Sequence, residues 1–314
     1  MEAGEIDDHG GLAPEQLRTL QVKRDGPGLV RITVQLGLIA VATALTLRTE
    51  GPLWLLWVGI LGILIGGLFG PLHETCHRTA FASRTINEVV AWICAFPQLY
   101  LPGLFREFHF EHHRRTQDRK QDPEIMAMPD LLDGFPGDPL RYFVLATGQH
   151  LLFGKAMFIL AGALAPASAF PKIFPYVHAR RVARVQWESR IALVIFAAGI
   201  TLGLLYVPHF GRLLVAWPVA HLLLGFYLLA EHTGLPNDGT QNHRTRSVTS
   251  NALMRWLFWN MPLHAIHHMH PAIPFHAMPE AHRLALPTLE HVSTGYFAVH
   301  REALAHAFRS KPRA

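Results

Sequence analysis

The chain has 314 residues, of which half are hydrophobic and only 16% are charged, with a formal net charge of +5. Soluble domains carry about 25% charged residues, so this composition excludes an ordinary soluble protein, although the length alone would suit about two domains. A positive net charge can indicate nucleic-acid binding, but here Lys and Arg flank apolar runs instead of covering one soluble face. We therefore predict a membrane protein that does not bind nucleic acid.

The amino-terminal segment is polar and partly acidic, without the apolar stretch that a cleavable signal peptide requires. We expect residues 1–28 to form a cytoplasmic tail. Four later apolar runs approach the length of about 20 residues that crosses a bilayer core. We predict that these four spans cover residues 29–47, 53–72, 191–207 and 213–230.

Two further apolar segments do not fit a simple span. Residues 89–101 are too few to cross and end at a Pro-Gly pair, so we predict an interfacial or re-entrant helix. Residues 141–170 are numerous enough but carry Gln149, His150 and Lys155 in the middle, and we place them along the cytoplasmic interface. An even number of crossings then separates residue 113 from residue 264.

The distribution of cations predicts the orientation of the spans. Arg48 and Arg212 are the only cations in the two short loops between paired spans, which we place outside. We expect a larger set inside: Arg78, Arg84, Arg106, Arg114, Arg115, Arg119, Lys120, Arg180, Arg181, Arg184 and Arg190. Only two cysteines are present, so we expect no disulfide framework.

Three histidine clusters lie on the polar side of the apolar segments and are the most informative motif. The first reads H-x-x-x-H and the other two read H-x-x-H-H. On a helix, residues i, i+3 and i+4 share one face, so each cluster directs its imidazoles to a common point. Their members are His73 and His77, then His109, His112 and His113, then His264, His267 and His268.

A ninth imidazole, His232, stands at the end of the fourth predicted span, at the same membrane depth. A single structural or catalytic zinc would use three or four ligands and leave five of these histidines without a role. We therefore predict a site for two metal ions. Ligand type does not name the metal, because imidazole suits zinc, copper, iron and nickel.

These residues resemble the histidine boxes of the membrane fatty acid desaturase superfamily, which includes acyl desaturases, lipid hydroxylases and carotenoid ketolases. The resemblance covers roughly residues 55–285. It extends to Thr116-Gln117-Asp118 and Asp122-Pro123-Glu124 after the second box, and to Asn260-Met261-Pro262 before the third.

The resemblance implies an all-α integral membrane fold, with four transmembrane helices and a cytoplasmic helical cap that carries a histidine-rich di-iron site. On this basis residues 29–290 form the desaturase-like domain and residues 291–314 a cytoplasmic tail. It further implies a non-haem centre of two iron ions that uses O2 and two external electrons on an alkyl C–H bond. The implied iron ligands are His73, His77, His109, His112, His113, His264, His267 and His268, with His232 as the additional one.

Carboxylates near the boxes are candidates to orient the imidazoles through their other ring nitrogen. The candidates are Glu74, Glu107, Glu111, Asp118, Asp122 and Glu231, and Asn260 lies one helical turn before His264. The sequence does not rank them. It also names no catalytic residue beyond the metal centre and no site for an organic cofactor.

Three functions are compatible with the sequence. The first is a desaturase that introduces a double bond into a lipid acyl chain or a small non-lipid metabolite. The second is a hydroxylase or ketolase of an alkyl, sterol or carotenoid substrate. The third is a non-enzymatic haem-binding or metal-transporting membrane protein, which would place histidines or other polar groups within the spans.

The sequence contains no haem-binding His-Pro-Gly-Gly signature, flavin fingerprint or cysteine cluster, so we expect electrons to come from a separate ferredoxin, cytochrome or reductase. The basic stretch around Arg114, Arg115, Arg119 and Lys120 is either a docking surface for that donor or a solvated charge run.

A stripe of small residues, Gly59, Gly62, Gly66 and Gly70, lies on the second predicted span. Such stripes usually mark close helix packing, and the alternative is room for an alkyl chain. His221, in the middle of the fourth span, is too distant from His232 to bind the same metals and either packs or lines a substrate tunnel. We interpret the lone histidines elsewhere, such as His9 and His178, as polar surface residues.

Overall fold

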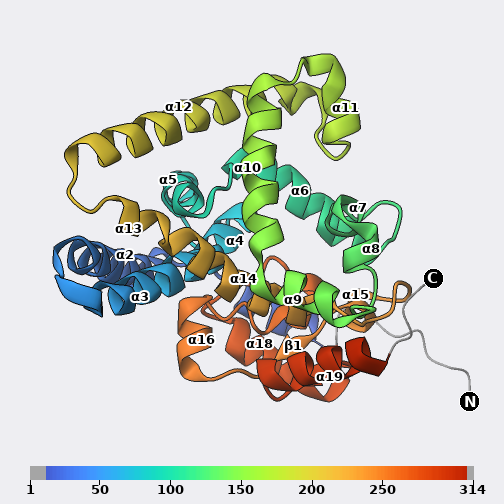
Figure 1. The fold of residues 1–314 in the computed structure, drawn as a ribbon. Coiled ribbons are helices and arrows are strands. Elements are labelled where there is room, and N and C mark those ends of the chain that lie inside the picture. Colours follow the sequence, from blue (N-terminus) through green and yellow to red (C-terminus); the bar gives the residue numbers. More distant parts are fainter. Residues whose placement is uncertain (1–11, 310–314) are drawn as a thin grey trace, which may run out of the picture.

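The computed structural model describes residues 12–309, and these are mostly helical (Figure 1). Four helical segments are long and apolar enough to cross a bilayer: Asp25–Arg48, Gly51–His77, Ala179–Tyr206 and Gly211–His232. They comprise α2 (Asp25–Arg48), η1 (Gly51–Leu53) with α3 (Trp54–Gly67) and α4 (Phe69–His77), η4 (Ala179–Arg181) with α12 (Val182–Tyr206), and α13 (Gly211–Leu214) with α14 (Ala216–His232). This confirms the four predicted spans as membrane-spanning candidates. Each helix extends several residues beyond its apolar run.

The spans form two hairpins whose tips lie at the same end of the molecule, on the left in Figure 1. Arg212, at the tip of the second hairpin, donates to the backbone oxygens of Thr46 at 3.2 Å and Thr49 at 2.8 Å. Its guanidinium also lies 5.1 Å from the ring centroid of Trp54. Since α3 and α14 pack together and both run away from these tips, His77 and His232 reach the opposite end together.

The two segments that did not fit simple spans are broken helices. The helix of α5 (Arg84–Ala95) and η2 (Phe96–Gln98) is bent by 93° from α6 (Pro102–Arg115), and α9 (Pro139–Thr147) by 60° from α10 (Gln149–Leu164). α5 has 12 residues and α10 has 16, fewer than the about 20 that cross a bilayer core. Their placement at the membrane interface stays a prediction.

The break before α10 has a steric cause. Gly148 has a φ of 64° and approaches α14 so closely that a Cβ atom there would lie 1.9 Å from the carbonyl oxygen of His221. Gly225 of α14 faces the same contact, where a Cβ atom would lie 2.4 Å from the backbone nitrogen of Gly148. Only glycines permit this approach, which presses the start of α10 onto the middle of α14.

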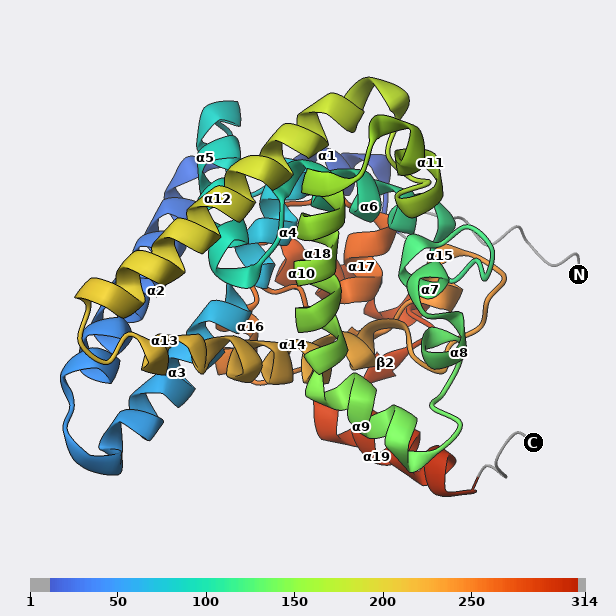
Figure 2. The same ribbon diagram turned by 45° about the horizontal axis from the view of Figure 1, so that its top comes forward.

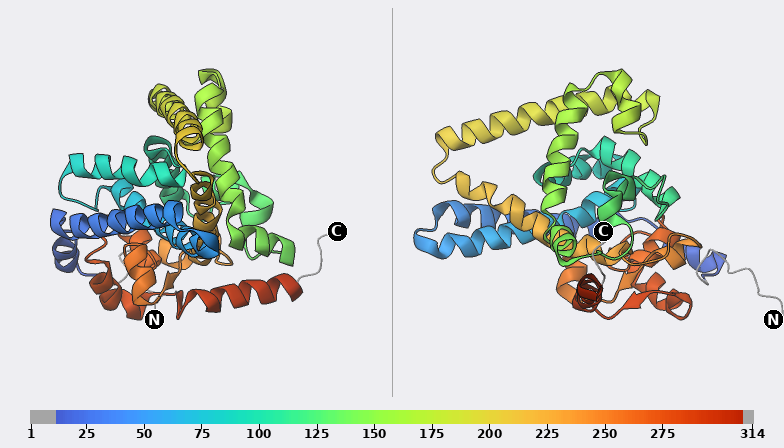
Figure 3. Two further views of the ribbon diagram at one scale, coloured as in Figure 1. Left: turned by 60° about the vertical axis from the view of Figure 1, so that its left-hand side comes forward. Right: turned by 45° about the vertical axis from the view of Figure 1, so that its right-hand side comes forward.

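The remaining elements gather away from the hairpin tips. α19 lies along the edge of the molecule opposite α12 (Figures 1 and 3), and Figure 2 shows α10 crossing the span α14. Their bounds are α1 (Pro14–Leu20), α7 (Pro123–Ala127), α8 (Pro129–Leu132), η3 (Ala167–Ala169), α11 (Phe170–Ile173), α15 (Gln241–Arg244), α16 (Ala252–Leu257), α17 (His264–Met269), α18 (Met278–Ala285), η5 (Leu286–Thr288) and α19 (Tyr296–Arg309). β1 (Ser247–Val248) pairs in parallel with β2 (Val292–Ser293).

The two segments expected as tails contain helices and a strand where the structure describes them. Of residues 291–314, β2 joins the small sheet and α19 buries Val299 and Ala303 against the core. Of residues 1–28, Leu12 and Leu20 are buried and α1 contacts α18. The apolar residues of these short helices recur on one face, a weak signal beside the long spans. Residues 1–11, including His9, and 310–314 lie outside the described residues.

The glycine stripe packs α3 against its neighbours. A Cβ atom at Gly62 would lie 2.5 Å from Val219, and one at Gly66 would lie 2.9 Å from the carbonyl oxygen of Ala220, both on α14. A Cβ atom at Gly59 would meet nothing within 4 Å. Gly62 and Gly66 therefore allow α3 and α14 to approach closely, as in other membrane helix pairs.

We predict that Gly66→Leu destabilises the protein by about 1–3 kcal/mol, because the added side chain overpacks this contact. The matched control, Gly59→Ala, should leave the unfolding temperature unchanged or slightly raise it, since Ala favours the helix. Tryptophan fluorescence during thermal unfolding in detergent measures both. A Gly66→Leu protein with an unchanged unfolding temperature and an altered preference for substrate length would instead assign Gly66 to a substrate tunnel.

Candidate metal centre

The first histidine box extends the second span beyond the core. Helix α4 continues from α3 after a break at Leu68 and carries His73 and His77 on its last turns. Gly70 allows this helix to touch the loop before the third box, because a Cβ atom there would lie 2.5 Å from the backbone of Phe258. The first and third boxes are thereby held next to each other.

The second box lies on α6, which begins with Pro102 in its first turn, where the missing N–H costs nothing. Arg106 of this helix donates to the carbonyl oxygens of Cys76 at 3.2 Å and Thr75 at 3.3 Å. It also pairs with Glu88 at 3.1 Å. Arg106 therefore caps carbonyl groups at the end of α4 and ties the second box to the first.

The third box lies on α17, after a tight loop in which Trp259 and Asn260 have φ values of 51° and 61°. The Trp259 indole is fully buried and donates to Gln35 of α2 at 3.2 Å. The Asn260 amide donates to the carbonyl oxygen of Phe275 at 2.9 Å. These contacts fix the loop against the spans and direct α17 toward the other two boxes.

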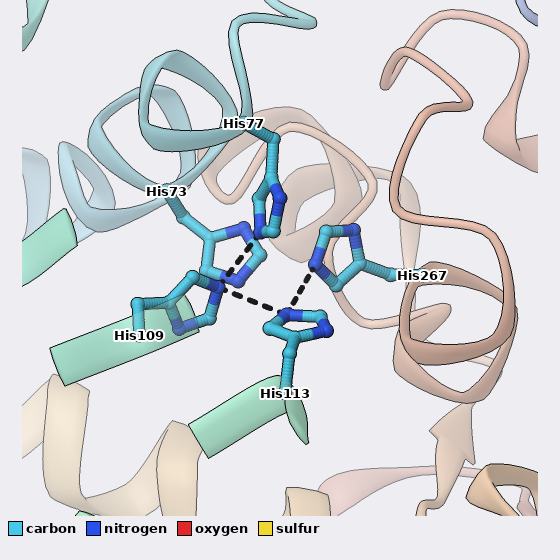
Figure 4. Close-up of side chains that lie close together, drawn as sticks. All are labelled: His73, His77, His109, His113 and His267. Carbon is cyan, nitrogen blue, oxygen red and sulfur yellow. Dashed lines mark hydrogen bonds between the residues drawn. The ribbon is translucent and has the colours of Figure 1, made fainter. Parts of the chain in front are cut away.

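Five of the nine predicted histidines form one group, here called the first imidazole group: His73, His77, His109, His113 and His267 (Figure 4). One nitrogen from each lies within 4.8 Å of those of the others. Contacts between Nε2 atoms join His77 to His109 at 2.9 Å, His109 to His113 at 3.0 Å and His113 to His267 at 3.1 Å.

The other four histidines form the second imidazole group: His112, His232, His264 and His268. Ligand nitrogens of His112, His232 and His268 lie within 4.8 Å of one another. The Nε2 atoms of His232 and His264 are 2.9 Å apart. The two groups adjoin, because the rings of His113 and His268 stack at a centroid distance of 4.1 Å. The structure thus brings all nine predicted imidazoles together.

The donor set fits metal ions better than mutual hydrogen bonds. A neutral imidazole nitrogen either donates one hydrogen bond or accepts, so hydrogen bonds cannot account for all three contacts in the first group. Two metal–imidazole bonds of about 2.1 Å at a right angle would separate their nitrogens by about 3.0 Å, which matches these contacts. Within the described residues, the buried Nε2 atom of His268 also lacks a hydrogen-bond partner.

The third-box histidines are held in the form that binds metals. Burial, and then the neighbouring imidazoles, keep the pKa of His264, His267 and His268 well below its usual range. These side chains are therefore neutral at physiological pH and keep a free lone pair for a cation.

Two of the proposed orienting carboxylates contact an imidazole. Asp122 meets Nδ1 of His112 at 3.0 and 3.1 Å, and Glu231 lies 3.3 Å from Nδ1 of His264. Each contact leaves Nε2 of the histidine free to face the centre of its group.

Three further orienting contacts were not predicted. Glu124 lies 3.2 Å from Nδ1 of His112, Thr116 lies 3.3 Å from Nδ1 of His268, and the carbonyl oxygen of Arg244 accepts from His232 at 3.0 Å. The Asp122-Pro123-Glu124 motif offered a signal for Glu124. The contact of His232 with the Arg244 carbonyl could not be predicted, because every residue has a backbone carbonyl group.

The other candidates have different partners, and no hydrogen bond to the nine imidazoles joins them within residues 12–309. Glu74 accepts from Thr79 at 2.8 Å and from the backbone nitrogen of Phe275 at 3.1 Å. Glu107 and Glu111 pair with arginines, Asp118 accepts from the backbone of Lys120, and Asn260 binds the carbonyl oxygen of Phe275. These residues hold the surrounding backbone in place.

A largely apolar cavity of about 200 Å³ opens beside the imidazoles. Its lining includes members of both groups, His73 and His109 of the first and His112, His232 and His264 of the second. Leu and Phe side chains of α6, α10 and α14 also line it. The cavity therefore offers an apolar ligand direct access to the imidazole groups.

The fold and this site define a polytopic helical membrane protein whose histidine-rich centre adjoins an apolar cavity. The sequence profile described as fatty acid desaturase matches residues 52–300. The chain belongs to this fatty acid desaturase family, as the histidine boxes predicted.

Two curated relatives are similar to the chain. Sphingolipid delta(4)-desaturase DES1 of Drosophila melanogaster is 26% identical over 233 residues, which cover 71% of this chain and 63% of that protein. Sphingolipid delta(4)-desaturase/C4-monooxygenase DES2 of Rattus norvegicus is 25% identical over 284 residues, which cover 86% of this chain and 77% of that protein. The chain thus spans less than two thirds of the length of the first relative.

We predict that Asp122→Asn weakens metal binding by about 10- to 100-fold, because the carboxylate that orients His112 is lost. Titration with a chelator, followed by measurement of iron per chain, gives this change. The matched control is Glu111→Gln, a carboxylate within the second box that pairs with Arg114, and this variant should bind metal like the wild type. Equal iron retention by Asp122→Asn and the wild type would contradict the orienting role.

Proposed function

We propose that the protein is a membrane-bound non-haem di-iron oxidoreductase that uses O2 and two electrons to introduce a double bond into a lipid acyl chain. The observation that carries the proposal is the pair of adjoining imidazole groups at the edge of an apolar cavity. Membership of the fatty acid desaturase family and the names of both relatives support it.

The nine imidazoles would hold the two iron ions. The first imidazole group offers five nitrogens and the second offers four, enough for one ion each. Bound iron would supply the oxidising power to remove hydrogen from an unactivated alkyl C–H bond, which no side-chain acid or base can do. Haem ligation would need histidines that face each other within the spans, whereas these lie at the ends of α4 and α14 and on α6 and α17.

The protein residues position the substrate and the ligands. Leu and Phe side chains of the cavity exclude water and hold an acyl chain extended past His73, His109 and His264. Asp122, Glu124 and Glu231 keep the Nδ1 side of their histidines engaged.

Hydroxylation is the second candidate. One relative carries C4-monooxygenase beside desaturase in its name, so a similar chain is associated with both outcomes. The apolar cavity suits either reaction, since both begin at an alkyl C–H bond. The products differ: desaturation removes two hydrogen atoms, and hydroxylation adds one oxygen atom.

We place the imidazole groups on the cytoplasmic side of the membrane, where a separate ferredoxin, cytochrome or reductase would deliver electrons. Positive residues on that side and their scarcity at the hairpin tips support this orientation. Arg114, Arg115 and Arg119 are largely exposed, although each pairs with a carboxylate. They provide a docking surface for an acidic donor.

We predict that His267→Ala lowers both iron content and product formation by more than about 100-fold, because it removes a ligand and not only an orienting contact. Mass spectrometry of lipids from cells that express each variant, with iron analysis of the purified proteins, measures the change. The control His178→Ala alters an exposed histidine outside the imidazole groups and should behave like the wild type. Full turnover by His267→Ala would refute the proposed centre.

A further inference from the structure

Lys155 is the residue of the cavity that the proposed reaction leaves without a role. It lies on α10 and lines the same cavity as the imidazole groups. The side chain is buried, and its Nζ atom has no hydrogen-bond partner among residues 12–309. Its only strong contact in that part of the chain is with the ring of Tyr100, whose centroid lies 3.7 Å from Nζ.

A buried amine without a partner is unfavourable, and cation–π attraction to one tyrosine offsets only part of that cost. Buried polar groups in proteins are almost always satisfied by a partner, a water or a ligand. A leucine or methionine at this position would fill the space without that cost. The burial of this amine is therefore best explained by an acceptor that comes from outside the protein.

A second donor in the same cavity has no partner either. The hydroxyl of Tyr176 is buried and lacks a hydrogen-bond partner within the described residues, and Tyr176 also lines the cavity. Its ring is held edge-on by Phe108 at a centroid distance of 5.4 Å. By contrast, the carboxylates Glu124 and Glu231, which also line the cavity, lie next to His112 and His264.

We propose that Lys155, together with Tyr176, binds the carboxylate or carbonyl oxygen of the acyl substrate and thereby fixes which carbon lies at the imidazole groups. This inference rests on the proposed function and deepens it by naming a polar group of the substrate. An oxygen acceptor is the kind of partner that both donors lack, and the apolar lining would receive the alkyl chain. The position of the new double bond is then counted from the oxygen-bearing end.

The first test is the variant Lys155→Met, which keeps a long side chain but removes the amine. Because it removes a buried unpaired group, its unfolding temperature without ligand should equal or exceed that of the wild type. Lys172→Met, at an exposed position on α11, is the matched control. Binding of radiolabelled hexadecanoic acid, N-methylhexadecanamide and hexadecane to the purified full chain in detergent compares the variants.

Lys155→Met should bind the two oxygen-bearing ligands at least tenfold more weakly than the wild type does and bind hexadecane equally well. Loss of affinity for hexadecanoic acid alone identifies a carboxylate as the ligand group, and loss for both identifies a carbonyl oxygen. Unchanged affinities for all three ligands would overturn the proposal. Tyr176→Phe gives an independent test if Lys155→Met does not fold: a smaller loss of the same selectivity is expected, and none would overturn the role of the donor pair.

Product analysis separates this inference from the proposed function. If the wild type forms double bonds at one position and Lys155→Met forms them at several, both are supported. If the wild type forms no oxidised product but binds the oxygen-bearing ligands through Lys155, only the proposed reaction fails. If Lys155→Met forms its double bond at the same position as the wild type and binds all three ligands with the same affinities, the proposed reaction is supported and the role of Lys155 is refuted.

Discussion

The convergence of nitrogen lone pairs inside a dry helical interior is the constraint on which the rest of the structure depends. Four Nε2 atoms follow one another at 2.9 to 3.1 Å in the first imidazole group, although neutral imidazoles alone gain little from this arrangement. The protein must therefore hold them there by other means. Arg106, the close contact at Gly70 and the buried Trp259 do so by joining the three helices that carry the boxes.

The sequence predicted the parts of the fold that depend on local patterns. Four long apolar runs indicated four spans, because a bilayer core demands uninterrupted helices. The spacing of the boxes placed their histidines on common helical faces. The expectation that all boxes share one side of the membrane set an even number of crossings between the second and the third. His232 was included from its depth in the membrane, and the structure places it 2.9 Å from His264.

The parts that the sequence did not predict depend on contacts between distant residues. Nothing in the local sequence distinguishes Asp122, which reaches His112, from Asp118, which binds the backbone of Lys120. Glu74 stands inside the first box but faces Thr79 and Phe275 on the other side of its helix. The short terminal helices α1 and α19 have no strong signal in the sequence, because their packing and not their length reveals them.

The contact of Gly148 with the backbone of α14 has a consequence for how such a scaffold can diversify. Two main chains meet there without intervening side chains, so α10 cannot slide along α14 to lengthen or shorten the space beside His232. Changes in the size of accepted molecules would then arise from exchanges of side-chain bulk at lining positions such as Leu151 and Phe158 of α10. Related proteins could thus change the size of the substrate they accept by substituting side chains that line the cavity, while the backbone around the imidazoles stays constant.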